Sequence, residues 1–108
     1  MPIYNKLVRD KIPKVIERSG KAFQTRILSD NEYKQVLQKK LQEELEEYIS
    51  APNDQNAIEE LADILELIHA ITATHGSSME ELEQVRIKKL TDRGGFKDKV
   101  FLIEVADA

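Results

Sequence analysis

Two long stretches with the apolar spacing of an α-helix, separated by Ala51–Pro52, constrain the fold more than any other feature of this sequence. The first stretch carries one stripe at positions i, i+4, i+7 and i+11, formed by Leu37, Leu41, Glu44 and Tyr48. The second carries a stripe of the same spacing, formed by Glu60, Ile64, Leu67 and Ile71. Because the residue before a proline disfavours helix, the helix formed by the earlier of these two stretches must end near Ile49 or Ser50. We therefore predict two consecutive helices that pack antiparallel to each other.

The other elements follow from capping signals and glycines. A first helix begins near Asp10, takes Pro13 in its opening turn and ends at about Ser19. The later helices are expected from a cap at Ser29 to about residue 50, from a cap at 53 or 54 to about 75, and from a cap at Ser78 to about 92. Residues 22–28 and 99–105 have strand-like patterns, and we expect them to pair in a small two-stranded β ribbon. The prediction is an all-α fold of one domain spanning residues 1–108, with that ribbon attached.

Composition limits the class of protein. The 108 residues carry a net charge of −4 and no Cys, which argues against a nucleic-acid backbone binder and excludes a disulfide framework or thiolate metal site. No apolar run is long enough for a signal peptide or a membrane span. We expect a cytoplasmic protein with no nucleic-acid or membrane partner.

The acids of the two long helices divide by helical phase. Glu44 and Glu60 fall on the apolar stripes, while Glu47 and Asp63 lie at the stripes' edges. The other acids point further away from the stripes: Glu43, Glu46, Glu59 and Glu66. Solvated helix faces are the usual reason for such acids, but a carboxylate on a core-facing stripe costs several kcal/mol unless it is paired or protonated.

A hard divalent cation with oxygen ligands resolves the predicted convergence of acids. Each helix contributes a pair spaced i, i+3, which places two carboxylates about 5–6 Å apart on one face. Antiparallel packing then brings Glu44 and Glu47 opposite Glu60 and Asp63. No His occupies the position that di-iron bundles use, so Mg²⁺ or Mn²⁺ is favoured over iron.

At these residues the sequence resembles a known family. KLQEELEEY (40–48) followed by EELADILELI (59–68) is similar to the Glu-x-x-Glu, spacer, Glu-x-x-Asp pattern of the MazG-like all-α nucleoside triphosphate pyrophosphohydrolases. YNKLVRDKIP (4–13) and KKLTDRGGF (88–96) resemble segments of a short, single-domain subgroup. The superfamily includes phosphoribosyl-ATP pyrophosphohydrolase and the all-α dUTPases. The resemblance implies a four-helix MazG-like bundle.

The same resemblance implies a hydrolase of the house-cleaning type, a nucleotide pyrophosphatase that converts a modified or surplus nucleoside triphosphate to monophosphate and pyrophosphate. It makes Glu44, Glu47, Glu60 and Asp63 the catalytic residues and the Mg²⁺ ligands, with Glu47 our choice for orienting or deprotonating the attacking water. Lys40 matches a family lysine that offsets phosphate charge. A homodimer or higher homo-oligomer is also implied, and the wide apolar faces of the two long helices favour it independently.

Basic residues in the flanking segments are candidate phosphate ligands. Lys89 and Arg93 precede Gly94–Gly95, whose amides can approach an anion, although the same segment also suits a helix end followed by a strand anchored by Phe96. Arg9 and Lys11 are the candidates in the N-terminal segment, which also suits a polar helix entry. His69 and His75 match no ligand position and receive no role.

Two alternatives remain open at this stage. The first is hydrolysis of phosphoribosyl-ATP in histidine biosynthesis, although YNKLVRDKIP looks less like the dedicated histidine enzymes. The second is a non-catalytic helical module that uses the acidic groove to bind a metal or a basic partner. Neither the base nor the sugar of a nucleotide substrate can be read from the sequence.

Overall fold

A computed structural model describes residues 2–107, and its regular elements are four α-helices. They are α1 (Ile12–Arg18), α2 (Asp30–Ile49), α3 (Asp54–Thr74) and α4 (Met79–Arg93). The all-α class and the four expected helices are confirmed, with ends close to those that the capping signals predict. None of the helices in residues 2–107 combines the length and the apolar character needed to cross a membrane.

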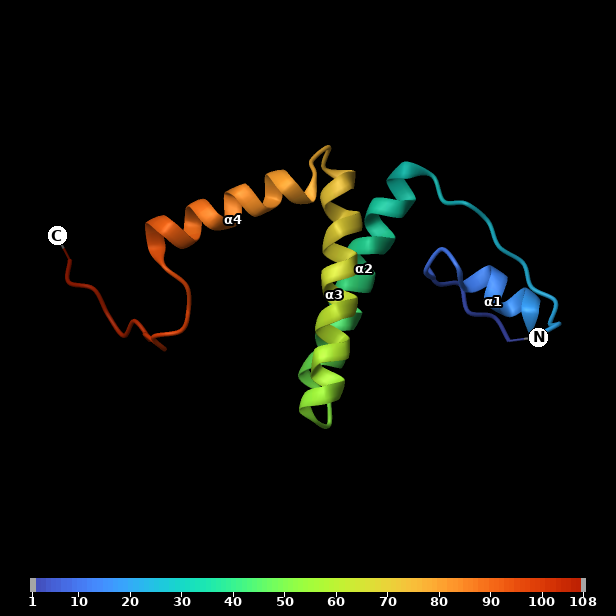
Figure 1. Ribbon diagram of the computed structural model, residues 1–108, viewed down its shortest axis with the longest axis horizontal. Helices are drawn as coiled ribbons and strands as arrows, with labels where there is room; N and C mark the ends of the chain where they lie inside the picture. The colour runs from blue at the N-terminus through green and yellow to red at the C-terminus, as the bar shows by residue number, and fades with distance from the viewer. Residues whose placement is uncertain (1, 108) are drawn as a thin grey trace.

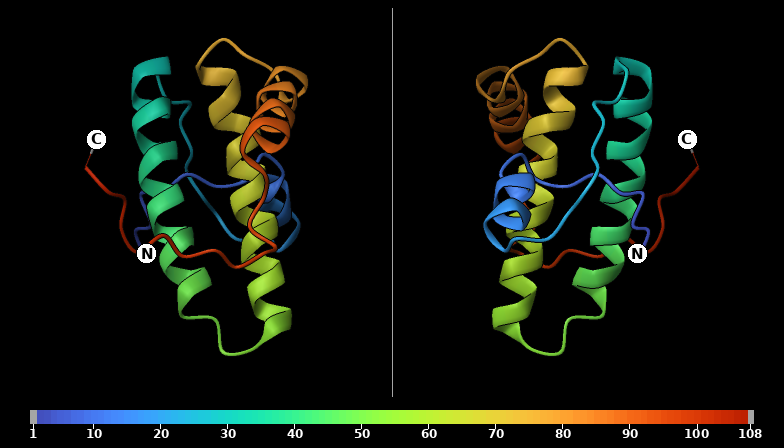
Figure 2. Two further views of the ribbon diagram at one scale, coloured as in Figure 1. Left: turned by 90° about the vertical axis from the view of Figure 1, so that its left-hand side faces the viewer. Right: turned by 90° about the vertical axis from the view of Figure 1, so that its right-hand side faces the viewer.

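The centre of the molecule is an antiparallel hairpin of α2 and α3, which lie side by side along their length (Figures 1 and 2). Leu37 of α2 and Ile64 and Leu67 of α3 are its buried residues. All three belong to the stripes predicted from the sequence, so the amphipathic pattern sets which sides of the two helices meet. The core is small and aliphatic.

Side-chain caps fix where the helices begin. Ser29 forms a complete capping box at the start of α2: its hydroxyl accepts from the Glu32 amide, and the Glu32 carboxylate accepts from the Ser29 amide. Asn53 caps α3 by accepting from the Asn56 amide. Ser78 caps α4 by accepting from the Glu81 amide, and the Glu81 carboxylate accepts from Ser77 Oγ at 2.8 Å.

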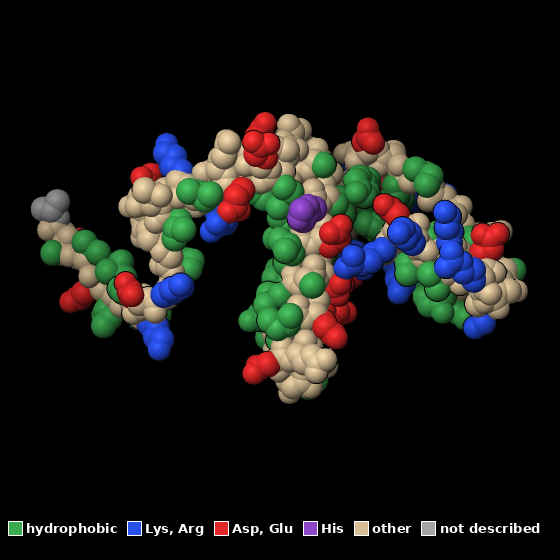
Figure 3. All heavy atoms as spheres, in the orientation of Figure 1, with side chains coloured by type: hydrophobic (Ala, Val, Ile, Leu, Met, Phe, Trp, Pro, Cys, Tyr) green, Lys and Arg blue, Asp and Glu red, His purple; other side chains and the backbone are tan. Residues whose placement is uncertain are grey.

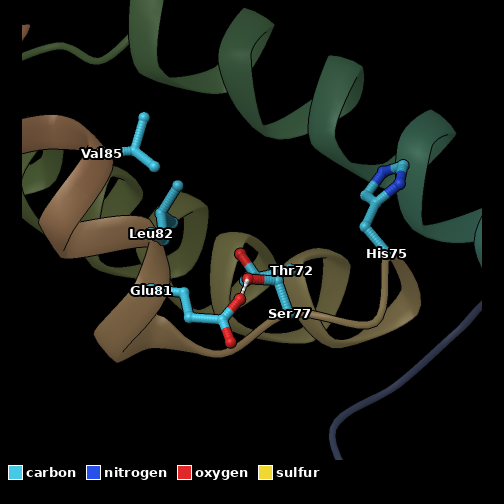
Figure 4. A pocket seen from close by; sticks show the side chains of 6 residues that line it. All are labelled: Thr72, His75, Ser77, Glu81, Leu82 and Val85. Atoms are coloured by element: carbon cyan, nitrogen blue, oxygen red, sulfur yellow. Dashed lines mark hydrogen bonds between the residues drawn. The ribbon is translucent and has the colours of Figure 1, made fainter.

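The helices α1 and α4 extend on opposite sides of the hairpin (Figure 1). The chain turns from α3 into α4 at Gly76, whose φ of +70° is a conformation that glycine adopts without strain. A hollow at this junction, shown in Figure 4, is lined by Thr72, His75, Ser77, Glu81, Leu82 and Val85. Because α1 and α4 extend away from the hairpin, the molecule is open, with extents of 65 × 36 × 25 Å and a radius of gyration of 18.9 Å.

The predicted β ribbon is wrong, because residues 2–107 contain no strand. Residues 22–28 lie on the α1 side of the hairpin, and residues 99–105 lie at the far end of the molecule beyond α4 (Figure 1). The local patterns suit strands, but a strand needs a partner for its backbone groups, and even an isolated hairpin is marginally stable in water. The two segments are too far apart in one chain to supply that partner.

Candidate metal centre

Three carboxylates converge on one side of the α2–α3 hairpin. Glu44 and Glu47 come from α2 and Glu60 comes from α3, and each offers one oxygen that lies within 4.8 Å of the other two. The i, i+3 spacing places the two α2 acids on one helical face, and antiparallel packing brings α3 alongside them. The structure thus brings together three of the four acids that the sequence singles out.

Two oxygens of this cluster are buried without a partner. Glu44 Oε2 and Glu60 Oε2 are enclosed, and no hydrogen-bond donor in residues 2–107 reaches either of them. An enclosed carboxylate oxygen without a donor carries the full cost of its lost hydration. It therefore needs either a proton or a cation.

The pKa of Glu44 reflects the same environment. It is raised from the ordinary value of 4.5 to about 7, first by burial and then by the facing Glu60 carboxyl, which can share a proton with Glu44. The negative charges of Glu47 and Asp63 act in the same direction. Near neutral pH the Glu44 carboxyl is therefore protonated in part of the molecules.

Two basic side chains approach the acids. Lys40 lies one turn before Glu44, with its Nζ 3.9 Å from Glu44 Oε1. Arg9 reaches in from the N-terminal segment, and its Nη2 lies 2.6 Å from Asp63 Oδ1. Asp63 is not one of the three converging acids, and its carboxylate is paired with Arg9. The sequence singled out Arg9 as a candidate phosphate ligand but gave no sign of this pairing.

The remaining predicted phosphate ligands lie elsewhere. Lys89 and Arg93 are exposed on α4, which extends away from the hairpin on the side opposite α1, and Lys11 is exposed at the start of α1 (Figure 1). Within residues 2–107, none of the three forms an ion pair with the acidic cluster.

A shallow open hollow on the outer side of α2 borders the acidic cluster. Its lining consists of Glu43, Glu46, Glu47 and Ser50, so Glu47 belongs to both the hollow and the cluster. The sequence assigned Glu43 and Glu46 to water, and both are exposed. Glu47 is also exposed and is the member of the triad that solvent can reach most freely.

The donor set suits a hard divalent cation. Three carboxylate oxygens from two rigid helices match the preference of Mg²⁺ and Mn²⁺ for oxygen ligands. The pair of enclosed, partnerless oxygens gives a physical reason for a cation there beyond the presence of acids. The fold and the cluster together define an all-helical protein with a candidate cation site on a helical hairpin.

Comparison with known proteins adds a partial relative. No family model matches the chain, and no solved structure matches it significantly. A protein of Mycolicibacterium smegmatis (strain ATCC 700084 / mc(2)155), described as an uncharacterized protein, is 45% identical over 53 residues. The match covers 49% of this chain, and the chain spans about half of that relative's length, 54%.

Proposed function

We propose that this protein is a MazG-like hydrolase that uses Mg²⁺, or Mn²⁺, to convert a modified or surplus nucleoside triphosphate to its monophosphate and pyrophosphate. The observation that carries the proposal is the pair of enclosed carboxylate oxygens, Glu44 Oε2 and Glu60 Oε2, with Glu47 beside them. The resemblance of three sequence segments, in the same order along the chain, supports this chemistry over other uses of a cation site.

The chain's own residues fit the cation. Glu44, Glu47 and Glu60 would hold it through one oxygen each, and Asp63 would join them once it is released from Arg9. When bound, Mg²⁺ supplies positive charge for the phosphate oxygens and lowers the pKa of a water molecule so that it can attack phosphorus near neutral pH.

Residues around the cluster account for the remaining steps. The oxygen of the attacking water forms a bond to the α-phosphorus while the α–β anhydride bond breaks and pyrophosphate leaves with the bonding electron pair. The proton of the water passes to a carboxylate, and the exposed Glu47 is the best placed acceptor in the triad. Lys40 and Arg9 offset the phosphate charge, because both already lie against the acids.

The proposal also names a homodimer or higher homo-oligomer as the working unit. Residues 2–107 contain three buried apolar residues and many exposed ones, so the chain has reason to bury apolar surface against another chain. Two assignments compete with this one: hydrolysis of phosphoribosyl-ATP, and a non-catalytic module that binds a metal. Measuring pyrophosphate release from a panel of substrates separates the three.

Pyrophosphate release is the measurement that tests the function. The purified protein with Mg²⁺ is expected to release pyrophosphate from at least one member of a panel of canonical and modified nucleoside triphosphates, with phosphoribosyl-ATP assayed in parallel. The Glu44→Gln and Glu60→Gln variants should lose at least about 100-fold in rate, as expected when a cation ligand is removed. Glu66→Gln, a matched change at an exposed position on α3, should retain activity.

Each remaining outcome identifies an alternative. Activity confined to phosphoribosyl-ATP would assign the histidine-pathway reaction. Mg²⁺ binding by calorimetry with an inert panel would favour a non-catalytic module. Full activity in both glutamine variants would remove the proposed site.

A further inference from the structure

The acidic cluster is followed by an aromatic and an amide side chain on the side of the turn that joins α2 and α3. Glu44 and Glu60 each contribute an oxygen to the cluster, so the two residues face each other across the hairpin. Tyr48 is four residues after Glu44, and Asn56 is four residues before Glu60. Antiparallel packing therefore places Tyr48 and Asn56 opposite each other, one helical turn closer to the end of the hairpin at the bottom of Figure 1.

Both of these side chains are open to a ligand. Tyr48 is 39% exposed, and Asn56 is half-buried. The backbone amide of Asn56 donates to Asn53, but within residues 2–107 no hydrogen bond uses the Asn56 side-chain amide or the Tyr48 hydroxyl. The hollow that borders the cluster extends in the same direction, from Glu47 to Ser50. Space and free polar groups thus occur together on this side of the carboxylates.

The other side of the cluster is closed and basic. The helical stripes there continue into the buried core: Leu37, Ile64 and Leu67. Lys40 precedes Glu44 by one turn, and Arg9 contacts Asp63, which follows Glu60 by about one turn. Figure 3 shows basic side chains against the acids on the α1 side of the hairpin. Along the hairpin axis the order is therefore positive charges, carboxylates, and then an aromatic ring with an amide.

We propose that Tyr48 and Asn56 bind the base of the nucleotide, while its β- and γ-phosphates point toward Lys40 and Arg9. A nucleoside triphosphate has the same order of groups, with its α-phosphate between the base and the other phosphates. At 1.5 Å per residue, Lys40 and Tyr48 lie about 12 Å apart along the axis of α2, a span that an extended nucleotide can bridge. This inference rests on the proposed function for the identification of the ligand as a nucleotide.

The two side chains suit a base because they supply complementary contacts. An aromatic ring offers a stacking surface to any base. A side-chain amide carries a donor beside an acceptor, and the edges of the bases present such pairs to it. The other aromatic residue of the hairpin, Tyr33, is at the opposite end of α2, so Tyr48 is the ring that the hairpin places beside the carboxylates.

Binding of nucleotide analogues that resist cleavage tests the role of Tyr48. The probes are the α,β-methylene analogues of adenosine, guanosine, cytidine and uridine triphosphates, with inorganic triphosphate as the reference without a base. In Mg²⁺, calorimetry on the full chain should show at least one analogue binding about tenfold or more tightly than the reference. Tyr48→Leu should remove this advantage, whereas Tyr48→Phe, which keeps the ring, and the control Tyr33→Leu should retain it.

A change of base preference tests the role of Asn56. A carboxylate accepts hydrogen bonds but does not donate them, and the edge of guanine presents two adjacent donors. Asn56→Asp should therefore shift the order of affinities toward the guanosine analogue by about tenfold relative to the others. Gln55→Asp adds the same charge at the neighbouring exposed position and should leave the order unchanged. Circular dichroism verifies that each variant keeps its helices.

The outcomes separate the base site from hydrolysis. The inference is overturned if no analogue binds more tightly than inorganic triphosphate, or if Tyr48→Leu weakens both kinds of ligand equally, which indicates a structural role. An unchanged order of affinities in Asn56→Asp removes Asn56 from the site. A chain that binds the analogues through Tyr48 but releases no pyrophosphate keeps this inference and loses the proposed hydrolysis. An active chain whose variants bind like the wild type does the reverse.

Discussion

The guanidinium of Arg9 lies against the carboxylate of Asp63, with Nη2 2.6 Å from Oδ1, although 54 positions separate the two residues in the sequence. This ion pair connects the N-terminal segment to the α2–α3 hairpin. Asp63 itself lies outside the cluster that Glu44, Glu47 and Glu60 form. In the proposed function Asp63 also serves the cation, so Arg9 and the bound cation would compete for its carboxylate.

Removing Arg9 should accordingly strengthen cation binding in the absence of nucleotide. We expect Arg9→Ala to bind Mg²⁺ about two- to fivefold more tightly by calorimetry, since both partners are about half exposed and an exposed ion pair is worth roughly 1 kcal/mol or less. Arg26→Ala removes an arginine that is paired with Glu32 away from the site, and it should leave the affinity unchanged. An unchanged or weaker affinity in Arg9→Ala would show that the two charges do not compete.

The affinity for Mg²⁺ should depend on pH through Glu44. Because the pKa of this carboxyl is raised to about 7, it holds a proton below neutral pH that the cation must displace. Calorimetry should therefore show affinity rising between pH 6 and pH 8, by up to about tenfold per unit below the pKa, and levelling above it. Glu46→Gln, on the exposed side of α2, should keep this profile. A flat profile in the wild type would contradict the assignment of Glu44.

Much of the hairpin could be predicted from the sequence because its determinants are local. Helical phase identified the stripes that contain Leu37, Ile64 and Leu67, and the caps at Ser29 and Ser78 located the starts of α2 and α4. Phase also selected the acids that the structure brings together, since the spacing of side chains on a helix follows from its geometry alone.

The features that sequence reasoning missed all depend on contacts between distant segments. The ribbon was wrong because residues 22–28 and 99–105 have suitable local patterns but no common neighbour. The pairing of Arg9 with Asp63 had no local signal, because the two residues are 54 positions apart and no helical spacing relates them. The placement of Lys89 on a helix that leaves the hairpin likewise depends on the turn at Gly76.

The capping box of α2 should contribute measurably to stability. Ser29→Ala removes the hydroxyl that accepts from the Glu32 amide, and the free energy of unfolding should fall by about 1 kcal/mol. Urea unfolding followed by circular dichroism measures the change. Ser50→Ala, at the other end of the same helix, serves as the control because its side chain forms no such cap. If the two substitutions lowered the free energy of unfolding equally, the loss would come from replacing any serine by alanine and not from the lost cap.

Stability without metal should fall as pH rises, in contrast to the usual behaviour of a paired carboxylate. The folded protein holds the Glu44 proton more tightly than the unfolded chain, whose carboxyl has the ordinary pKa of 4.5. The stabilising contribution is therefore complete below pH 4.5 and is lost as pH rises through about 7.

A neutral side chain of the same shape should remove this dependence. Glu44→Gln is expected to be more stable than the wild type at pH 8 in a metal chelator, by about 1–3 kcal/mol in urea unfolding, because it avoids an enclosed charge. Its amide can also donate to the partnerless Glu60 Oε2. Saturating Mg²⁺ should stabilise the wild type and leave Glu44→Gln nearly unchanged. A variant less stable than the wild type at pH 8 would show that the Glu44 charge is already compensated within the chain, with Lys40 as the nearest source.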